Sequence, residues 1–466
     1  MKHDLDYMSA LDLRDAIARK DISPVEVVQR SLMRMEETEP KLNAFTTRTP
    51  ELALDAARRA EQAVVRGAPL GLLHGLPISI KDLIAVKDVR LTFGSKTAAK
   101  NVSPMDAPSV ERVKAEGACI IGKTTTSEFG AKAVGDSPLT GITRNPWNLD
   151  KTPGGSSAGA AASVAAGVSP FALGTDGGGS VRIPASICGL FGIKAHFGRV
   201  PVFPAAATPT LAHVGSLSRT VRDSALLLQA IAGYDQRDPF TVAGEPPDFL
   251  AACEKPVKGM RIAWSPTMGF AKPLPEVVKI AERAALAFEE MGCTVELVEN
   301  VMDDPGDMWM ADFYAGVGTK LQSVLRNNPG EIDPAVGEIL RGALDQSIEE
   351  HYATVFRRYE FREKMRQFFT KYDLLLTPTL PVPAPDVGVD VPPGMSDRNI
   401  VSWVYYTYPF NLTGQPAASA PAGMTKNGLP VGLQIVGPMH GECDIFRAAA
   451  ALEEARPWTA RRPQGI

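Results

Sequence analysis

The N-terminal part of the chain places apolar residues at the 3.6-residue spacing of amphipathic helices. In the first such segment, Leu11, Leu13 and Ile17 recur at this spacing. The second opens with Ser23-Pro24-Val25-Glu26, which matches a capping box with proline at the first helical position. The pattern predicts three helices, over Ser9–Lys20, from Ser23 to about Glu37, and from Thr49 to Gly67.

From Pro77 onward, short apolar runs typical of buried strands alternate with helical stretches. The predicted strands are Pro77–Ile80, Ala118–Ile121, Pro170–Leu173, Phe191–Ile193, Met260–Trp264, Thr294–Val298, Asp373–Thr377 and Val431–Val436. The predicted helices are Ala107–Glu116, Ser157–Ala166, Thr220–Ala232, Leu274–Met291, Glu350–Tyr372 and Asp444–Glu454. This alternation predicts an α/β fold in which helices cover a sheet.

The change of pattern after the third helix suggests how the chain is organised. We predict an N-terminal helical region, residues 1–66, packed on one large α/β domain, residues 67–466. The proline-rich segment Pro378–Gly394 interrupts the second part, but sheet-like and helical patterns continue beyond it. We therefore interpret this segment as a surface loop rather than a domain boundary.

Composition and charge narrow the class of protein. The 466 residues are 44% hydrophobic, enough for a sizeable core, which excludes a mainly disordered chain. Lys and Arg number 49 against 53 Asp and Glu, so the net charge of −4 argues against nucleic-acid binding as the main function. Five dispersed cysteines and an N-terminus without an apolar signal-peptide core predict free thiols and a cytoplasmic location.

Two long segments, residues 152–175 and 400–425, contain no charged residue. Both hold prolines and hydroxyl-bearing side chains rather than about 20 consecutive strongly apolar residues, so we expect neither to span a membrane. We expect both to lie buried inside the protein.

One match to a nucleotide-binding pattern does not fit the chemistry of that pattern. Residues 117–124 follow the phosphate-loop consensus G-x-x-x-x-G-K-[ST]. The loop needs a flexible turn whose backbone amides face phosphate, whereas Ala118 to Ile121 are apolar and look like a strand. We predict a helix capped by Gly117, then a buried strand and a turn.

The glycines are not spread evenly: 11 of the 41 fall between Gly154 and Gly198, around two serine motifs. Ser156 lies in GGSSAG, at the entry to a helix of small residues, and Ser180 ends DGGGS directly after a predicted strand. A serine after successive glycines can present its hydroxyl beside converging backbone N–H groups, as a developing oxyanion requires. Glycines that only permit tight turns and close packing explain either motif alone equally well.

A nucleophilic serine needs a base. Of the six histidines only His196 is near the motifs, and the chain has no G-x-S-x-G elbow, so a Ser-His-Asp triad is poorly supported. Lys81 follows a run that predicts a buried strand, and burial favours the neutral, proton-accepting form of lysine. Taken alone, a lysine at a strand end is more often a solvated surface charge.

Taken together, these motifs closely resemble those of the amidase signature family. The family's pattern matches Lys81, GGSSAG and TDGGGS, with 75 residues from Lys81 to Ser156 and 24 from Ser156 to Ser180. Other segments are also similar to the family, namely residues 106–129, 145–148, 215–219, 411–417 and 429–434. The resemblance implies one large α/β domain, built on a mixed central sheet that helices cover on both sides.

The resemblance also implies a Ser–cis-Ser–Lys triad without a cofactor or metal ion. Ser180 is then the acyl nucleophile, Ser156, after a cis peptide from Gly155, passes the proton, and Lys81 is the general base. The family's oxyanion hole matches the backbone N–H groups that run through Gly177, Gly178 and Gly179 to Ser180. Its supporting positions, which orient this loop by hydrogen bonds, match Ser157, Asp176 and Arg182.

Members of the family cleave amides, and some cleave esters or carbamates. The segments Met308–Tyr314 and Trp403–Tyr406 can line an apolar cleft or belong to the core. We expect a small-molecule hydrophobic or aryl acyl amide as substrate, with carbamates and esters as further candidates. A glutaminase subunit of a tRNA-dependent amidotransferase and a catalytically silent binding protein of the same fold stay open, and so does a homodimer.

Overall fold

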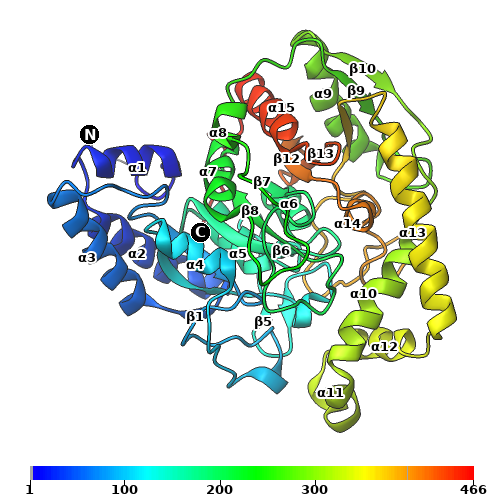
Figure 1. Cartoon of the computed structure of the whole chain (residues 1–466), viewed down its shortest axis with the longest axis horizontal. Coiled ribbons are helices and arrows are strands. Elements are labelled where there is room, and N and C mark those ends of the chain that lie inside the picture. The colour runs from blue at the N-terminus through cyan, green and yellow to red at the C-terminus, as the bar shows by residue number, and fades with distance from the viewer. Residues whose placement is uncertain (1–3, 396) are drawn as a thin grey trace.

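One mixed sheet extends through the molecule (Figure 1). The computed structural model describes residues 4–395 and 397–466. In these residues eleven strands form the sheet, in the spatial order β1 (Phe45–Arg48), β3 (Cys119–Thr124), β2 (Pro77–Lys81), β6 (Phe171–Asp176), β8 (His213–Ser218), β7 (Phe191–Lys194), β12 (Ala417–Met424), β13 (Pro430–Val436), β11 (Leu374–Pro378), β9 (Arg261–Trp264) and β10 (Thr294–Leu297). β2 is parallel to β3 and β6, whereas β8 is antiparallel to β6 and β7. A separate ribbon pairs β4 (Asp136–Ser137) with β5 (Gly141–Ile142).

Helices cover both faces of this sheet, which confirms the predicted α/β class. They are α1 (Ala10–Ala18), α2 (Pro24–Leu42), α3 (Pro50–Val65), α4 (Pro108–Ala115), α5 (Ala158–Ala165), α6 (Arg182–Cys188), α7 (Val221–Ile231), α8 (Phe249–Ala252), α9 (Pro275–Glu290), α10 (Gly306–Lys320), α11 (Gln322–Asn327), α12 (Pro334–Ala343), α13 (Ile348–Phe368), α14 (Pro409–Thr413) and α15 (Glu442–Ala455). Side chains of β6 alternate between the faces: Phe171 and Leu173 share a core with α7, while Ala172 shares one with α5.

The three predicted N-terminal helices are confirmed as α1, α2 and α3 (blue in Figure 1). The capping box at Ser23 is wrong, because Ser23 Oγ accepts from the N–H of Val25 and donates to Glu61. Helix α2 also continues past Glu37, until Asn43 adopts a left-handed φ of 50°. Residues 1–66 are not entirely helical, since β1 pairs antiparallel with β3 at the sheet edge. The domain boundary after residue 66 stays a prediction.

A second core lies beside the sheet, where α10, α12, α13 and α14 pack around large aromatic side chains. The two uncharged segments lie almost entirely buried, as predicted. Pro378–Gly394 was expected on the surface, but Leu380, Val382 and Ala384 pack into this second core because they are apolar side chains between the prolines. None of the helices in residues 4–395 and 397–466 has both the length and the apolarity needed to cross a bilayer.

The phosphate-loop match is the helix and strand that the apolar pattern predicts. Helix α4 ends at Ala115, Gly117 has a φ of 85°, and β3 begins at Cys119. Lys123, which would contact phosphate in such a loop, is completely buried and forms an ion pair with Asp82 at 2.9 Å. Residues 117–124 are therefore a turn and a buried strand of the sheet, not a phosphate-binding loop.

Candidate active site

Lys81 is the last residue of β2 and is completely buried. Its Nζ lies 2.7 Å from Ser156 Oγ, 3.0 Å from Ser157 Oγ and 2.9 Å from Thr175 Oγ1. Strand β2 pairs in parallel with β6, and Thr175 lies near the end of β6. This pairing places the Lys81 amine beside Thr175. Burial lowers the pKa of Lys81 well below its ordinary value, and the Asp176 carboxylate only partly opposes this shift. Lys81 is therefore a lysine that can be neutral and accept a proton.

Ser156 is presented to Lys81 by a tight glycine turn before α5. The Gly155–Ser156 peptide bond is cis, as the family resemblance implies. Glycine is required at position 155, because an added Cβ would lie 2.2 Å from the carbonyl oxygen of Val134. The next residue ties this turn to the second serine motif, because the N–H of Ser157 donates to the carbonyl oxygen of Ser180 at 3.2 Å.

Ser180 is a partly exposed residue that ends the glycine loop between β6 and α6. It lines a small pocket that Gly130 also lines. An added Cβ at Gly130 would lie 3.2 Å from Ser156 Oγ, so the Ser156 hydroxyl reaches the edge of the same pocket. The described residues include no hydrogen bond between Ser156 Oγ and Ser180 Oγ.

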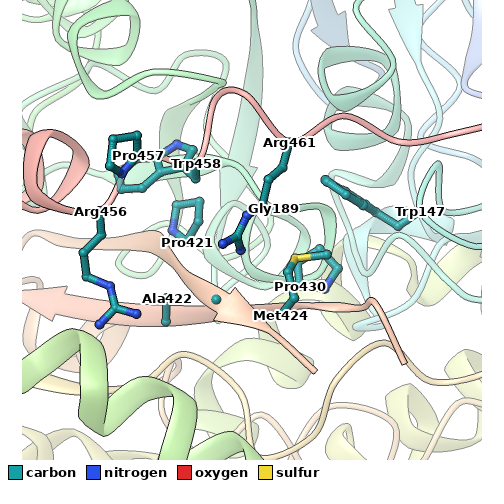
Figure 2. Close-up of a pocket in the computed structure, with 11 residues that line it drawn as sticks. Trp147, Gly189, Pro421, Ala422, Met424, Pro430, Arg456, Pro457, Trp458 and Arg461 are labelled. Atoms are coloured by element: carbon teal, nitrogen blue, oxygen red, sulfur yellow. The ribbon is translucent and has the colours of Figure 1, made fainter. Parts of the chain in front are cut away.

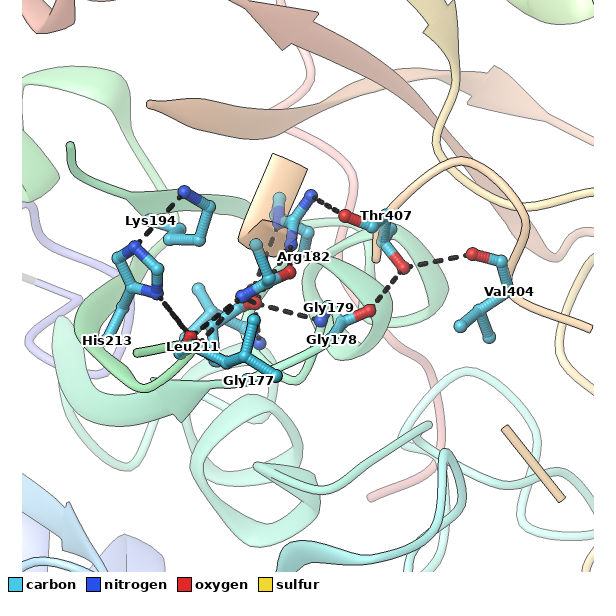
Figure 3. Close-up of polar contacts among 12 residues, drawn as sticks. Gly177, Gly178, Gly179, Arg182, Lys194, Leu211, His213, Val404 and Thr407 are labelled. Carbon is cyan, nitrogen blue, oxygen red and sulfur yellow. Dashed lines mark hydrogen bonds and ion pairs between the residues drawn. The ribbon is translucent and has the colours of Figure 1, made fainter. Parts of the chain in front are cut away.

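The carbonyl groups of the glycine loop are fixed by two side chains. Gly177 O accepts from Trp309 Nε1 at 2.8 Å. Gly178 O accepts from Thr407 Oγ1 at 2.6 Å (Figure 3). The N–H of Gly179 donates to Asp176 Oδ1 at 2.8 Å. The N–H groups of Gly177 and Gly178 have no acceptor in the part of the chain that the structure describes. Three of the four expected oxyanion donors, the N–H groups of Gly177, Gly178 and Ser180, thus have no acceptor among the described residues, whereas the Gly179 N–H orients the loop.

A buried ion pair between Asp176 and Arg182 stabilises this loop. Arg182 donates through Nη2 to Asp176 Oδ1 at 2.8 Å and through Nε to Oδ2 at 3.0 Å. Asn411 Nδ2 donates to the same carboxylate at 2.9 Å. Burial alone would raise the pKa of Asp176, but the charge and hydrogen bonds of Arg182 hold it well below its ordinary range. The carboxylate therefore stays ionised and continues to accept the hydrogen bond from the Gly179 N–H.

Replacing Arg182 by methionine should lower the free energy of unfolding by about 3–5 kcal/mol, because it leaves the Asp176 carboxylate buried without its ion-pair partner. Urea unfolding at neutral pH measures this change. The matched control is Arg237→Met, which removes ion pairs with Glu111 and Asp235 that are only partly buried and should cost below about 1 kcal/mol. Equal losses for the two variants would contradict the prediction.

The pocket at Ser180 has an aromatic wall. Trp309 and Phe313 stack with ring centroids 4.6 Å apart, and both line the pocket together with Ile183 and Val401. The loop glycines make room for these rings, because an added Cβ at Gly178 would lie 2.5 Å from Trp309. The expectation of an apolar cleft thus holds for two side chains of Met308–Tyr314, whereas Trp403–Tyr406 belong to the core.

A second, larger pocket lies elsewhere and contains none of the predicted site residues (Figure 2). Two tryptophans, Trp147 and Trp458, line it together with Arg456 and Arg461. The indole N–H groups of both tryptophans donate to backbone carbonyls, at 2.8 Å for Trp147 and 3.0 Å for Trp458. Two of the predicted site residues, Gly178 and Ser180, instead line the smaller pocket.

The structure brings the predicted site residues together as two connected groups. Lys81, Ser156 and Ser157 form one group, and Asp176 and Arg182 hold the glycine loop that ends at Ser180. The residues that sequence reasoning did not identify contact these groups through long-range hydrogen bonds: Thr175, Thr407, Asn411 and Gln434. An isolated amide inside an uncharged, apolar stretch is a signal that could have identified Asn411.

The described residues form neither a histidine triad nor a metal centre at this site. In the described ranges no histidine hydrogen-bonds Ser156, Ser157 or Ser180. The ring of His196 lies against that of His440 with centroids 4.0 Å apart, and burial lowers the pKa of His196 to about 3. Across residues 4–395 and 397–466, no group of three or more His, Cys, Asp or Glu side chains is arranged to hold a metal ion.

Comparisons with known proteins show which family this chain is similar to. The model of the family described as Amidase matches residues 26–446. An acylamidase of Rhodococcus erythropolis is 35% identical over 471 residues, 99% of this chain and 98% of that protein. A glutamyl-tRNA(Gln) amidotransferase subunit of Moorella thermoacetica is 36% identical over 488 residues, 99% of each. Among solved structures, a bacterial aryl acylamidase superposes with a TM-score of 0.92 at 30% identity over 98% of each chain. A 6-aminohexanoate cyclic dimer hydrolase gives 0.91 at 28% identity over 99% of each.

Proposed function

The chain belongs to the amidase signature family, and on this premise we propose that it hydrolyses carboxylic acid amides through an acyl-enzyme on Ser180. The observation that carries this proposal is the place of Lys81. A buried lysine of lowered pKa lies 2.7 Å from Ser156 Oγ, at the edge of the pocket that Ser180 lines. That arrangement supplies a base, a relay and an accessible hydroxyl in one place.

In the proposed mechanism the proton moves along Ser180, Ser156 and Lys81. Neutral Lys81 accepts the hydroxyl proton of Ser156 while Ser156 Oγ accepts that of Ser180. Ser180 Oγ attacks the amide carbonyl carbon, and the carbonyl electron pair moves to its oxygen, which accepts from the N–H groups of Gly177 and Gly178. Catalytic hydrogen bonds often tighten only in the substrate complex, so we expect Ser180 Oγ to turn toward Ser156 when substrate binds.

The same groups complete the cycle. As the C–N bond breaks, its electron pair stays on nitrogen, and protonated Lys81 returns the proton through Ser156 to the departing amine. Water then gives one proton to this relay and attacks the acyl carbon. The ester bond to Ser180 breaks, Ser180 recovers its hydroxyl proton, and the carboxylic acid leaves. The Asp176–Arg182 pair contributes by holding the loop that carries the oxyanion donors.

The lining of the pocket favours an uncharged, apolar acyl group. Trp309 and Phe313 form one wall of it. The cationic side chain in the lining, Lys132, already forms ion pairs at 2.6 Å to Asp136, 2.7 Å to Asp333 and 3.1 Å to Asp390, so its charge is not free to bind an anionic acyl group. We therefore propose hydrophobic or aryl acyl amides as substrates, with carbamates and aryl esters accepted. Similarity to the acylamidase and the aryl acylamidase supports this choice.

A substrate panel tests this proposal. We expect kcat/KM for an aryl or long-chain acyl anilide to exceed that for acetamide or glutamine by about 10–200-fold, because the apolar acyl group is buried against the aromatic wall. Carbamates and aryl esters complete the panel. A chain that turns over glutamine best, or none of these compounds, would overturn the proposed substrate class.

The second candidate function is the glutaminase component of an amidotransferase. It is favoured by identities of 34–36% to glutamyl-tRNA(Gln) amidotransferase subunits. Such a component would release ammonia from glutamine only when its partner chains are added. We expect the isolated chain to hydrolyse anilides and to gain no glutaminase activity when those partner chains are added. This result would favour the free-standing amidase over the amidotransferase subunit.

A further inference from the structure

The larger pocket (Figure 2) is formed by segments that are distant in sequence. The end of β12 forms one side, where a bulge between Pro421 and Gly423 interrupts the pairing with β13. The segment after α15, residues 456–461, supplies another side, and Trp147 contributes from the loop between β5 and α5. The cavity has a volume of about 230 Å³, whereas a cavity of about 150 Å³ is sufficient for benzene. It therefore has room for one aromatic ring that carries a short polar group.

The walls of this pocket are apolar and offer few hydrogen-bond donors. Trp458 is 7% exposed, and Trp147 is partly buried. Both indole N–H groups already donate to backbone carbonyls, so neither is free for a ligand. Three of the lining residues are prolines, which lack a backbone N–H, and no serine, threonine, asparagine or glutamine lines the pocket. Walls of this composition favour a flat apolar or aromatic group.

The charged side chains in the lining are both positive. Arg456 and Arg461 line the pocket, and no acidic side chain does. Among residues 4–395 and 397–466, neither arginine forms an ion pair. Arg456 Nη1 donates to the carbonyl oxygen of Arg283 at 2.6 Å, while the exposed Arg461 guanidinium has no acceptor in the same residues. Burial lowers the pKa of Arg456, the Arg283 and Arg461 cations lower it further, and Glu290 opposes this only in part. The pocket therefore carries positive charge that the described chain does not neutralise.

Arg461 is placed to hold an anion inside this pocket. Figure 2 shows its side chain extending from the C-terminal segment toward β12, with Trp147 and Trp458 on its two sides. A guanidinium binds a carboxylate through two parallel hydrogen bonds. An inorganic anion would use only the guanidinium and leave the apolar walls without a partner. We propose that this pocket is a second ligand site, which binds a small aromatic carboxylate with its ring against the tryptophans and its carboxylate on Arg461.

Isothermal titration calorimetry of the full chain with phenylacetate tests this site. We expect saturable binding with a Kd of about 1 mM or tighter, weakened at least about tenfold in Arg461→Met. Because Arg461 is exposed and its guanidinium has no partner among the described residues, the variant should keep the unfolding midpoint of the wild type. The matched control is Arg326→Met, which removes an exposed arginine of α11 outside the pocket lining and should leave the Kd within about twofold. No saturable binding to the wild type, or equal binding to Arg461→Met, would overturn the proposal.

Two analogues test the chemistry of the ligand. Phenylethanol keeps the ring and lacks the charge, whereas acetate keeps the charge and lacks the ring. Each should bind at least about tenfold more weakly than phenylacetate. Phenylethanol that binds as tightly would overturn the role of Arg461, and acetate or inorganic phosphate that binds as tightly would overturn the aromatic ligand. The two pocket linings share no residue, so phenylacetate bound beside Ser180 would show equal affinity for the wild type and Arg461→Met. None of these readouts depends on the proposed amidase activity.

Discussion

Replacing Ser180 by alanine should lower kcat/KM for any amide, ester or carbamate substrate by at least about 10⁴-fold. The hydroxyl is the only group of the proposed triad that lines the pocket, and alanine removes the attacking oxygen while leaving the loop backbone intact. Because Ser180 Oγ has no hydrogen-bond partner in the described residues, the variant should keep the stability of the wild type. Steady-state kinetics with an anilide, together with the unfolding midpoint, measure both effects.

Two controls sharpen this result. Ser163→Ala removes another buried hydroxyl, which donates to Ala160 O at 3.1 Å within α5, and should leave kcat/KM within about twofold. A carbamate whose covalent adduct is hydrolysed slowly should modify the peptide of the wild-type chain that contains Ser180. The mass of this peptide should increase by the mass of the acyl group less one hydrogen. If Ser180→Ala keeps more than a small fraction of the activity, or still forms this adduct, the nucleophile is another residue.

Part of the sheet could be predicted because it depends on local sequence, whereas the choice of Lys81 as a buried base came from the family resemblance. Short apolar runs bounded by glycine or helical stretches identified β2, β3, β6 and β7 to within a few residues. Lys81 at the end of such a run was a candidate base, and the structure buries it completely. The absence of charge over residues 152–175 correctly indicated that the first serine turn lies in the interior.

The remaining parts depend on contacts between distant segments. Thr407 and Asn411 contact the glycine loop and Asp176 from more than 200 positions along the chain. A local pattern can indicate that Asn411 is buried, but not which groups these two side chains bind. Helix α10 was not predicted, because its apolar positions serve the second core and the pocket together. Helix α12 was not predicted either, and its buried side chains belong to the second core. The Gly179 N–H was expected to serve an oxyanion, but the carboxylate three residues earlier accepts it.

Replacing Lys81 by methionine should lower kcat/KM by about 10²–10⁴-fold and remove the rise of activity with pH. In the wild type, only the neutral amine can accept the Ser156 proton, so activity should increase as the pH rises through the lowered pKa of Lys81. Methionine has a similar length and no ionisable group, so the fold should be retained. The pH dependence of kcat/KM for an uncharged anilide measures both changes.

Stability gives an independent check on the same lysine. The pKa of Lys81 is lower in the folded chain than in the unfolded chain, so between these two values the unfolded chain binds more protons. Wild-type stability should therefore rise with pH across this interval and lose the contribution as the pH falls through it, whereas Lys81→Met should show a shallower slope. The prediction is wrong if Lys81→Met keeps both the rise of kcat/KM with pH and the pH dependence of the free energy of unfolding of the wild type. That result would show that Lys81 is charged in the folded protein, and a charged lysine cannot act as the base.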